Sequence, residues 1–160
     1  MSEQALANKQ LIERFYDAFN RHDGDAMAAC YAPGATFTDP VFVGLSDGEP
    51  QDMWRMLVGR SRDMTVELVE QGADGEEWGT ARWIARYTFG QTGRSVVNDV
   101  RSEFKFDPAG LIVSQRDEFD FWRWARQALG TTGLLLGWTP VLQHSVRDKA
   151  RAGLAAFRDT

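Results

Sequence analysis

The feature that most constrains the fold is a change of hydrophobic period near residue 65. Before this point the apolar residues have mainly helical spacing, apart from the alternating segment 35–42. After it they alternate with polar residues, as in strands with one buried face. The predicted strands are Thr65–Gln71, Trp78–Phe89, Ser95–Phe106 and Leu111–Phe121. Short turn clusters at 72–75, 90–93 and 107–110 join them, which predicts an antiparallel meander. Because helices come first and strands follow, the predicted class is α+β.

Helices are predicted on both sides of this strand region. Residues 3–21 form an amphipathic helix with one apolar stripe, and a short helix runs from Asp23 to Cys30. A third helix begins after Ser46 or Asp47 as its cap, and further helices cover 122–129 and 140–157, joined by a Gly-rich apolar link over 130–137. We expect a single domain over residues 1–160, with a core over about 3–121 and a C-terminal helical extension over about 122–160.

Composition excludes several classes of function. The formal net charge of −5 argues against a nucleic-acid partner, which requires a basic face. The longest apolar run near the C-terminus, Leu134–Trp138, is too short to cross a membrane, and no signal peptide is visible. His22 and His144 have no partners at metal-ligand spacing, so no metal is expected. The single cysteine, Cys30, suits a reducing compartment, and we therefore expect a cytoplasmic protein.

The segment 35–42, which reads ATFTDPVF, contains the first candidate catalytic residue. Phe37 alternates with Thr36 and Thr38 as in a strand, and the strand runs into an Asp-Pro step. Proline fixes its own φ and pushes the residue before it towards an extended conformation. Asp39 is therefore held at a strand end among large apolar neighbours, an environment typical of a general base with a raised pKa.

Alternation along the predicted strands indicates which side chains line a cavity on the concave face of a curved sheet. The expected ligand-contacting residues are Trp83 and Tyr87, Asn98 and Ser102, and Gln115, Asp117 and Phe119, with Tyr16 and Trp54 from the helices. The opposite faces carry Asp99, Arg101, Glu103 and Lys105, and Arg116, Glu118 and Asp120 together with Ile112. An apolar cavity with few polar groups is typical of a small-molecule site.

Two interpretations of the inward carboxylates remain open at this point. Asp39 and Asp117 in one apolar cavity can divide into a base and an acid with separated pKa values. Alternatively, Asp117 hydrogen-bonds a backbone group at a strand bend or pairs with an arginine, and Asn98 and Ser102 satisfy each other as polar core residues.

Two stretches of the sequence resemble the nuclear transport factor two-like superfamily. They are residues 15–40, with Asn20 ending the first helix before the ATFTDP strand, and residues 104–121, which begin FKFDPAGLIV. This superfamily includes ketosteroid isomerases, SnoaL-like polyketide cyclases and limonene-epoxide hydrolases. The resemblance implies a cone-shaped fold, with a curved antiparallel sheet wrapped around the N-terminal helices, and a homodimer formed through the outer sheet face.

The resemblance also assigns roles to individual residues. Asp39 falls on the general base of the ketosteroid isomerases, but Phe15 stands at the position of their oxyanion-hole tyrosine and Ser102 at that of their protonated aspartate. The segment 116–120, which reads RDEFD, is similar to a segment of the limonene-epoxide hydrolases in which the first aspartate, here Asp117, is an acid. Those enzymes also use an Arg-x-Asp on an earlier strand, and residues 81–86 contain no aspartate.

The predicted function is therefore that of a SnoaL-like pocket protein that binds a small apolar or polycyclic ligand. As an enzyme it is a cofactor-free isomerase, cyclase or hydrolase, with Asp39 as base and Asp117 as acid. The alternative is a non-catalytic ligand-binding or interaction module of the same fold. The two carboxylates distinguish these hypotheses: the enzyme gains support if both open onto one cavity.

Overall fold

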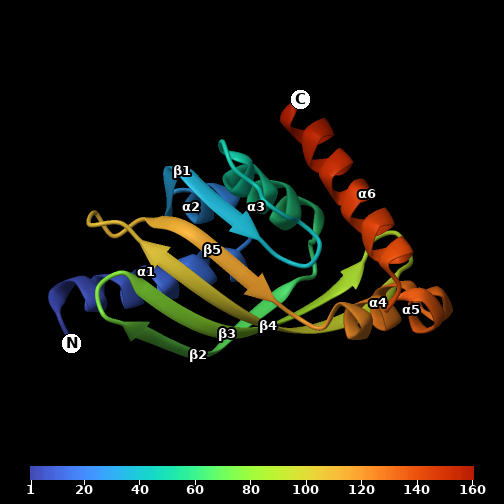
Figure 1. Cartoon of the computed structure of the whole chain (residues 1–160), viewed down its shortest axis with the longest axis horizontal. Coiled ribbons are helices and arrows are strands. Elements are labelled where there is room, and N and C mark those ends of the chain that lie inside the picture. The colour runs from blue at the N-terminus through green and yellow to red at the C-terminus, as the bar shows by residue number, and fades with distance from the viewer.

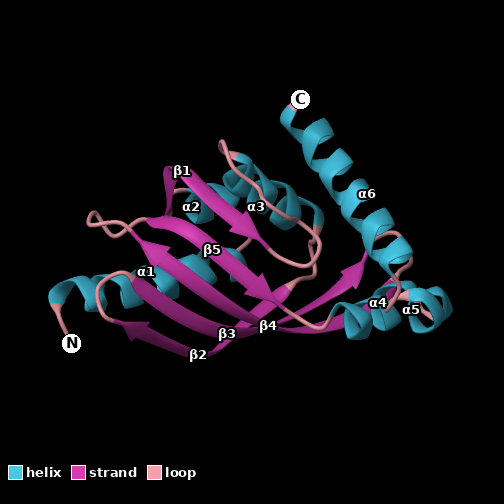
Figure 2. Cartoon of the chain, viewed as in Figure 1, coloured by secondary structure: helices cyan, strands magenta, loops and turns pink.

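The computed structural model describes residues 1–160 and contains six helices and five strands (Figures 1 and 2). The elements are α1 (Glu3–Asn20), α2 (Gly24–Ala28), β1 (Tyr31–Thr38), α3 (Glu49–Arg60), β2 (Thr65–Asp74), β3 (Trp78–Phe89), β4 (Arg94–Phe106), β5 (Ile112–Glu118), α4 (Phe121–Leu129), α5 (Thr131–Leu136) and α6 (Pro140–Arg158). This order confirms the predicted α+β class with helices before the sheet and a helical extension after it.

One curved sheet with the strand order β1-β5-β4-β3-β2 forms the frame of the molecule. Strands β2 to β5 are the predicted antiparallel meander. Strand β1 adds to the other edge, parallel to β5, and the two arrowheads point the same way in Figure 1. Alternation along the sequence did not predict this pairing, because β1 and β5 are far apart in the sequence.

The core lies between the concave face of the sheet and the N-terminal helices. Ile12 and Phe15 of α1 are fully buried, and the Phe15 ring meets those of Trp54 and Phe104 edge to face, with centroids 5.6 and 6.3 Å apart. Such aromatic pairs add stability beyond the area that they bury. The opposite sheet face carries exposed charged residues such as Glu103, as the alternation predicted.

Four local expectations were wrong, each for a physical reason. Val113 forms a bulge, because Lys105 pairs with Ser114 whereas Phe106 pairs with Ile112. The bulge reverses the facing of the first residue of β5, so Ile112 is fully buried although an outward position was predicted. Neither Ser46 nor Asp47 is the N-cap of α3. The N-cap is Gly48, which has a φ of 82° and no side chain that could accept a capping hydrogen bond.

The other two differences concern the region after the sheet. Strand β5 ends at Glu118 rather than Phe121, because Asp120 caps α4 by accepting a hydrogen bond from the Arg123 N–H. The predicted link over 130–137 contains the short helix α5. A Cβ on Gly133 would lie 1.8 Å from the Ala125 carbonyl oxygen, so only glycine allows α5 this close to α4.

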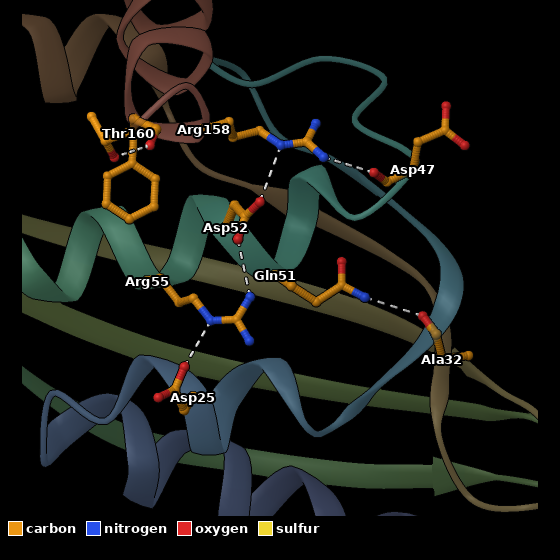
Figure 3. Close-up of polar contacts among 9 residues, drawn as sticks. Asp25, Ala32, Asp47, Gln51, Asp52, Arg55, Arg158 and Thr160 are labelled. Atoms are coloured by element: carbon orange, nitrogen blue, oxygen red, sulfur yellow. Dashed lines mark hydrogen bonds and ion pairs between the residues drawn. The ribbon is translucent and has the colours of Figure 1, made fainter.

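The helix α6 crosses from α5 to α3, and its cations form several polar contacts with the body of the protein (Figures 1 and 3). Arg158 donates to the Asp52 carboxylate of α3 at 3.0 Å and to the Asp47 carbonyl at 2.9 Å. Asp52 also accepts from Arg55, which continues to Asp25 of α2. Leu154 is the one buried residue of α6.

The extension covers only part of its own apolar surface. Trp124 is buried and Leu129 is half-buried, but Leu134, Leu135, Leu136 and Trp138 are exposed at the α5–α6 junction. None of the helices combines the length and the apolar character that crossing a membrane requires.

Candidate functional site

The parallel pairing of β1 with β5 brings the two candidate carboxylates together. Phe37 pairs with Gln115 and Thr38 with Arg116. The next residues along these two strands are Asp39 and Asp117. Because neighbouring strands lie about 5 Å apart, this register places both carboxyl groups at the same level of the sheet. Both face one cavity.

Asp39 sits in a tight turn that follows β1. Its backbone N–H donates to the Phe42 carbonyl at 2.8 Å, and its Oδ1 accepts from the backbone N–H groups of Val41 and Phe42 at 2.7 and 2.6 Å. Pro40 occupies the turn position that suits its fixed φ. The side chain of Arg147 on α6 donates to the Pro40 carbonyl at 2.9 Å, so the extension holds the turn from outside.

Asp117 lies at the centre of a buried hydrogen-bond network. Its Oδ1 accepts from Ser102 Oγ at 2.6 Å and from Gln115 Nε2 at 2.9 Å. Ser102 Oγ in turn accepts from the Tyr16 hydroxyl at 2.9 Å and from Trp83 Nε1 at 2.8 Å. This network fixes one carboxyl oxygen of Asp117 and its orientation.

A second branch of the network starts at Trp54 on α3. Trp54 Nε1 donates to the Tyr31 hydroxyl at 2.7 Å, and that hydroxyl donates to Gln115 Oε1. The sequence analysis missed Tyr31, because the alternation was followed only from Ala35 onward and the register of β1 shifts between Tyr31 and Thr36. The network therefore joins α3, β1 and β5 behind the carboxylate.

In both carboxyl groups Oδ1 accepts all the hydrogen bonds and Oδ2 accepts none. Neither Oδ2 is among the buried polar atoms without a partner, so each is open to the cavity. One oxygen of each aspartate thus has a structural role and the other is free to meet a ligand. This arrangement combines the two interpretations that the sequence left open.

The two carboxyl groups have raised and different pKa values. Burial raises the pKa of Asp39 to about 6, although the two backbone N–H groups and the positive charge of Arg147 lower it. Burial and, to a lesser degree, the negative charge of Asp39 raise the pKa of Asp117 to about 7, against the lowering by its two side-chain hydrogen bonds. Asp39 is the more acidic of the two, because two backbone N–H groups and Arg147 favour its ionised form, whereas the charge of Asp39 disfavours ionisation of Asp117.

The cavity in front of these groups has a volume of about 750 Å³ and mostly apolar walls. Seven predicted site residues line it: Asp39, Trp54, Trp83, Tyr87, Asn98, Asp117 and Phe119. Three others, Tyr16, Ser102 and Gln115, lie behind the wall in the hydrogen-bond network rather than at the cavity surface.

The sequence analysis assigned no site residue to the extension, yet α6 forms one wall of the cavity. Leu142, Val146, Lys149 and Gly153 line it at helical spacing, and Trp124 of α4 lines it too. Trp124 Nε1 donates to the Tyr87 hydroxyl at 2.8 Å, which fixes both rings. The amphipathic pattern of α6 signals a buried face, but the sequence does not show what that face covers.

Few other charged side chains lie near the two carboxyl groups. Arg82 forms an ion pair with Asp99 at 2.8 Å on the outer face, so it does not reach the carboxylates. Arg60 is the one arginine that lines the cavity, at the last residue of α3. No three His, Cys, Asp or Glu residues come close enough together to hold a metal ion.

Comparison with solved structures places this architecture in the nuclear transport factor two-like class. An LEH-like epoxide hydrolase of M. tuberculosis is 22% identical, with a TM-score of 0.66 over 82% of this chain and 97% of that one. A putative polyketide cyclase of Xanthomonas campestris pv. campestris is 18% identical, with a TM-score of 0.67 over 78% of this chain and 98% of that one. An NTF2-like protein of unknown function from Burkholderia pseudomallei is 22% identical, with a TM-score of 0.65 over 79% of this chain and 98% of that one.

The family itself follows from the sequence match. Residues 12–115 match the SnoaL-like domain, and the chain therefore belongs to this family. The match confirms the superfamily that the ATFTDP strand and the FKFDPAGLIV segment indicated. No curated protein matches the chain.

Proposed function

We propose that the protein is a cofactor-independent acid–base enzyme that acts on a small, largely apolar ligand with a carbonyl group. The observation that carries this proposal is the pair of free carboxyl oxygens, Asp39 Oδ2 and Asp117 Oδ2, open to one apolar cavity. The different pKa values give the two groups different roles at neutral pH. An ionised base beside a protonated acid is what proton transfer within a ligand requires.

In the proposed reaction, Asp39 removes a proton from the carbon next to the carbonyl and becomes a carboxylic acid. Asp117 hydrogen-bonds the carbonyl oxygen and gives it its proton as the enol forms. In an isomerisation of an unsaturated ketone, Asp39 returns its proton to another carbon of the dienol while the enol O–H proton goes back to Asp117, which restores both groups. In a cyclisation, the enol carbon attacks a second carbonyl, Asp39 gives its proton to the new alkoxide oxygen, and the enol O–H proton returns to Asp117. Asn98 lines the cavity and supplies an amide that can orient the ligand.

A non-catalytic ligand-binding module is the second candidate, and one observation favours it. Phe15 is fully buried among aromatic rings, so the position that carries a tyrosine in the ketosteroid isomerases provides no donor. The neighbouring Tyr16 hydroxyl is committed to Ser102. Asp117 is then the only acid left to stabilise an oxyanion. A binding protein of the same fold would be expected to keep such an incomplete set of catalytic groups.

Hydrogen–deuterium exchange distinguishes these two candidates without knowledge of the natural product. The protein is incubated in D₂O at neutral pH with 2-tetralone and 2-decalone, and deuterium uptake next to the carbonyl is followed by NMR. Enzyme-catalysed exchange that Asp39→Asn abolishes supports the proposal. Asp63→Asn is the matched control, because Asp63 is an exposed carboxylate bound to Thr88 at the cavity wall. Saturable binding with exchange no faster than in buffer would favour the binding module.

Hydrolysis of an epoxide is a variant of the same acid–base chemistry. It is suggested by the similarity to the LEH-like epoxide hydrolase. In this variant Asp39 activates a water molecule and Asp117 protonates the epoxide oxygen. Incorporation of ¹⁸O from labelled water into limonene oxide tests it, with the same two variants.

We further propose a cytoplasmic homodimer that associates through the outer sheet face. Arg101 on this face stands opposite Arg82, which is paired with Asp99, and it has no ion pair of its own, so an acidic residue of a second copy can pair with it. Cys30 is buried and free, which is compatible with a reducing compartment. Sedimentation equilibrium tests the assembly: a wild-type dimer that Arg101→Glu dissociates supports it, and a wild-type monomer at micromolar concentration contradicts it.

A further inference from the structure

The acidic and the basic residues that line the cavity lie at different ends of it. Of the residues that line it, four are charged: Asp39 and Asp117 where β1 and β5 meet, and Arg60 and Lys149 at the side where α3 and α6 face each other. The acidic end is half-buried to buried, and the basic end is exposed at the rim. A ligand that enters therefore meets a positive rim and a partly negative interior.

The two cations come from facing helices and line the same cavity. Arg60 Nη1 is 3.7 Å from the position that a Cβ on Gly153 would occupy, so the guanidinium of α3 reaches α6. Lys149 is one helical turn before Gly153 and lines the cavity on the same face of α6. The only acidic residues that line the cavity are Asp39 and Asp117 at its other end, so no lining acid lies beside these two positive charges.

Neither cation has a protein partner, unlike the others of these two helices. Arg55, Arg151 and Arg158 each pair with an aspartate or a glutamate. Arg147 donates to a backbone carbonyl. Arg60 and Lys149 form no ion pair and no side-chain hydrogen bond, and they are the two that line the cavity. The cations that hold α6 in place are thus distinct from those that face the ligand.

We infer that the ligand carries an acidic group, such as a carboxylate, at one end of its apolar body, and that Arg60 and Lys149 bind this group at the rim. The inference rests on the proposed function for the chemistry at the other end, where the apolar body reaches Asp39. The ionised Asp39 repels an anion, so the acidic group can occupy only the rim. This charge order gives the ligand a single orientation, with the reacting carbon towards Asp39.

A matched pair of ligands tests the inference. 2-Naphthoate and 2-naphthamide have nearly the same size and shape, but only the former is an anion at neutral pH. Each is titrated into ¹⁵N-labelled protein while the indole N–H signals are followed by NMR. Signals of Trp83 and Trp124 report binding in the cavity, whereas Trp138 reports binding at the exposed α5–α6 junction.

We expect naphthoate to bind in the cavity about fivefold to tenfold more tightly than naphthamide, as two partly exposed charge contacts allow. Arg60→Gln/Lys149→Gln should abolish this preference and leave the naphthamide affinity unchanged. Arg62→Gln/Lys9→Gln is the control, because it removes the same charge from two residues that do not line the cavity.

Three results would overturn the inference: a preference that survives in Arg60→Gln/Lys149→Gln, equal affinities in the wild type, or no shift of the cavity signals by either compound. The result is separable from that of the exchange experiment. Asp39→Asn should retain or increase the preference for naphthoate while abolishing deuterium exchange. Absence of catalysed exchange in the wild type, together with a clear preference for naphthoate, would therefore contradict the proposed function alone.

Discussion

The buried carboxyl of Asp117 should make the stability of the protein depend on pH in a way that Asp117→Asn removes. The folded state raises the pKa of this group from 3.8 to about 7, so it holds the proton more tightly than the unfolded chain. The stabilisation is fully present below about pH 4 and is lost as the pH rises through 7. The sign is opposite to that of an aspartate in a salt bridge, whose contribution grows with pH.

The magnitude follows from the two pKa values. Each pKa unit corresponds to about 1.4 kcal/mol, so the interval from 3.8 to about 7 corresponds to about 4 kcal/mol of unfolding free energy. An asparagine can still accept hydrogen bonds from Ser102 and Gln115, and it does not ionise. The wild type should therefore lose up to about 4 kcal/mol relative to Asp117→Asn between pH 4 and pH 8.

Urea denaturation of both proteins at a series of pH values measures this difference. Groups that are unaffected by the substitution cancel when the two curves are subtracted. A subtracted curve that falls with pH and levels off above pH 7 is the expected result. A flat curve would refute the reasoning, because it would mean that Asp117 ionises as easily in the folded protein as in the unfolded chain. In an Asp39→Asn background the subtracted curve should level off at a lower pH, because the negative charge of Asp39 raises the pKa of Asp117 in the folded protein.

Three further predictions concern the neighbours of the site. Arg147→Gln should raise the pKa of Asp39 above about 6, because the positive charge lowers it, and carboxyl ¹³C NMR titration measures this. Leu154→Ala should lower the unfolding free energy by about 2–4 kcal/mol, because Leu154 is the buried residue of α6. Arg158→Gln, which removes an ion pair at the surface, should lower it by at most about 1 kcal/mol. Urea denaturation of the two variants measures both changes. Ser102→Ala should raise the pKa of Asp117, because it removes the shortest hydrogen bond to its carboxylate, and the same NMR titration shows whether the pKa instead stays constant.

The sequence predicted much of the site because alternation is a local property. Ser102 and Asp117 follow the period of their own strands, so their burial could be read from the residues on either side. The pattern failed for Ile112, where the bulge at Val113 interrupts the period. It also failed to separate the residues that touch the cavity from Gln115 and the others that stand behind it, because both kinds are inward-facing.

By itself, the sequence determined the class of the fold, the elements and the two candidate carboxylates. These depend on short-range patterns: hydrophobic period, turn residues and the Asp-Pro step at Asp39. Only the tertiary structure decided that β1 lies parallel to β5, which brings Asp39 beside Asp117, and that α6 returns across the cavity with Lys149 facing Arg60. Both depend on contacts between residues far apart in the chain, and no local pattern encodes which distant segment a strand end or a helix face will meet.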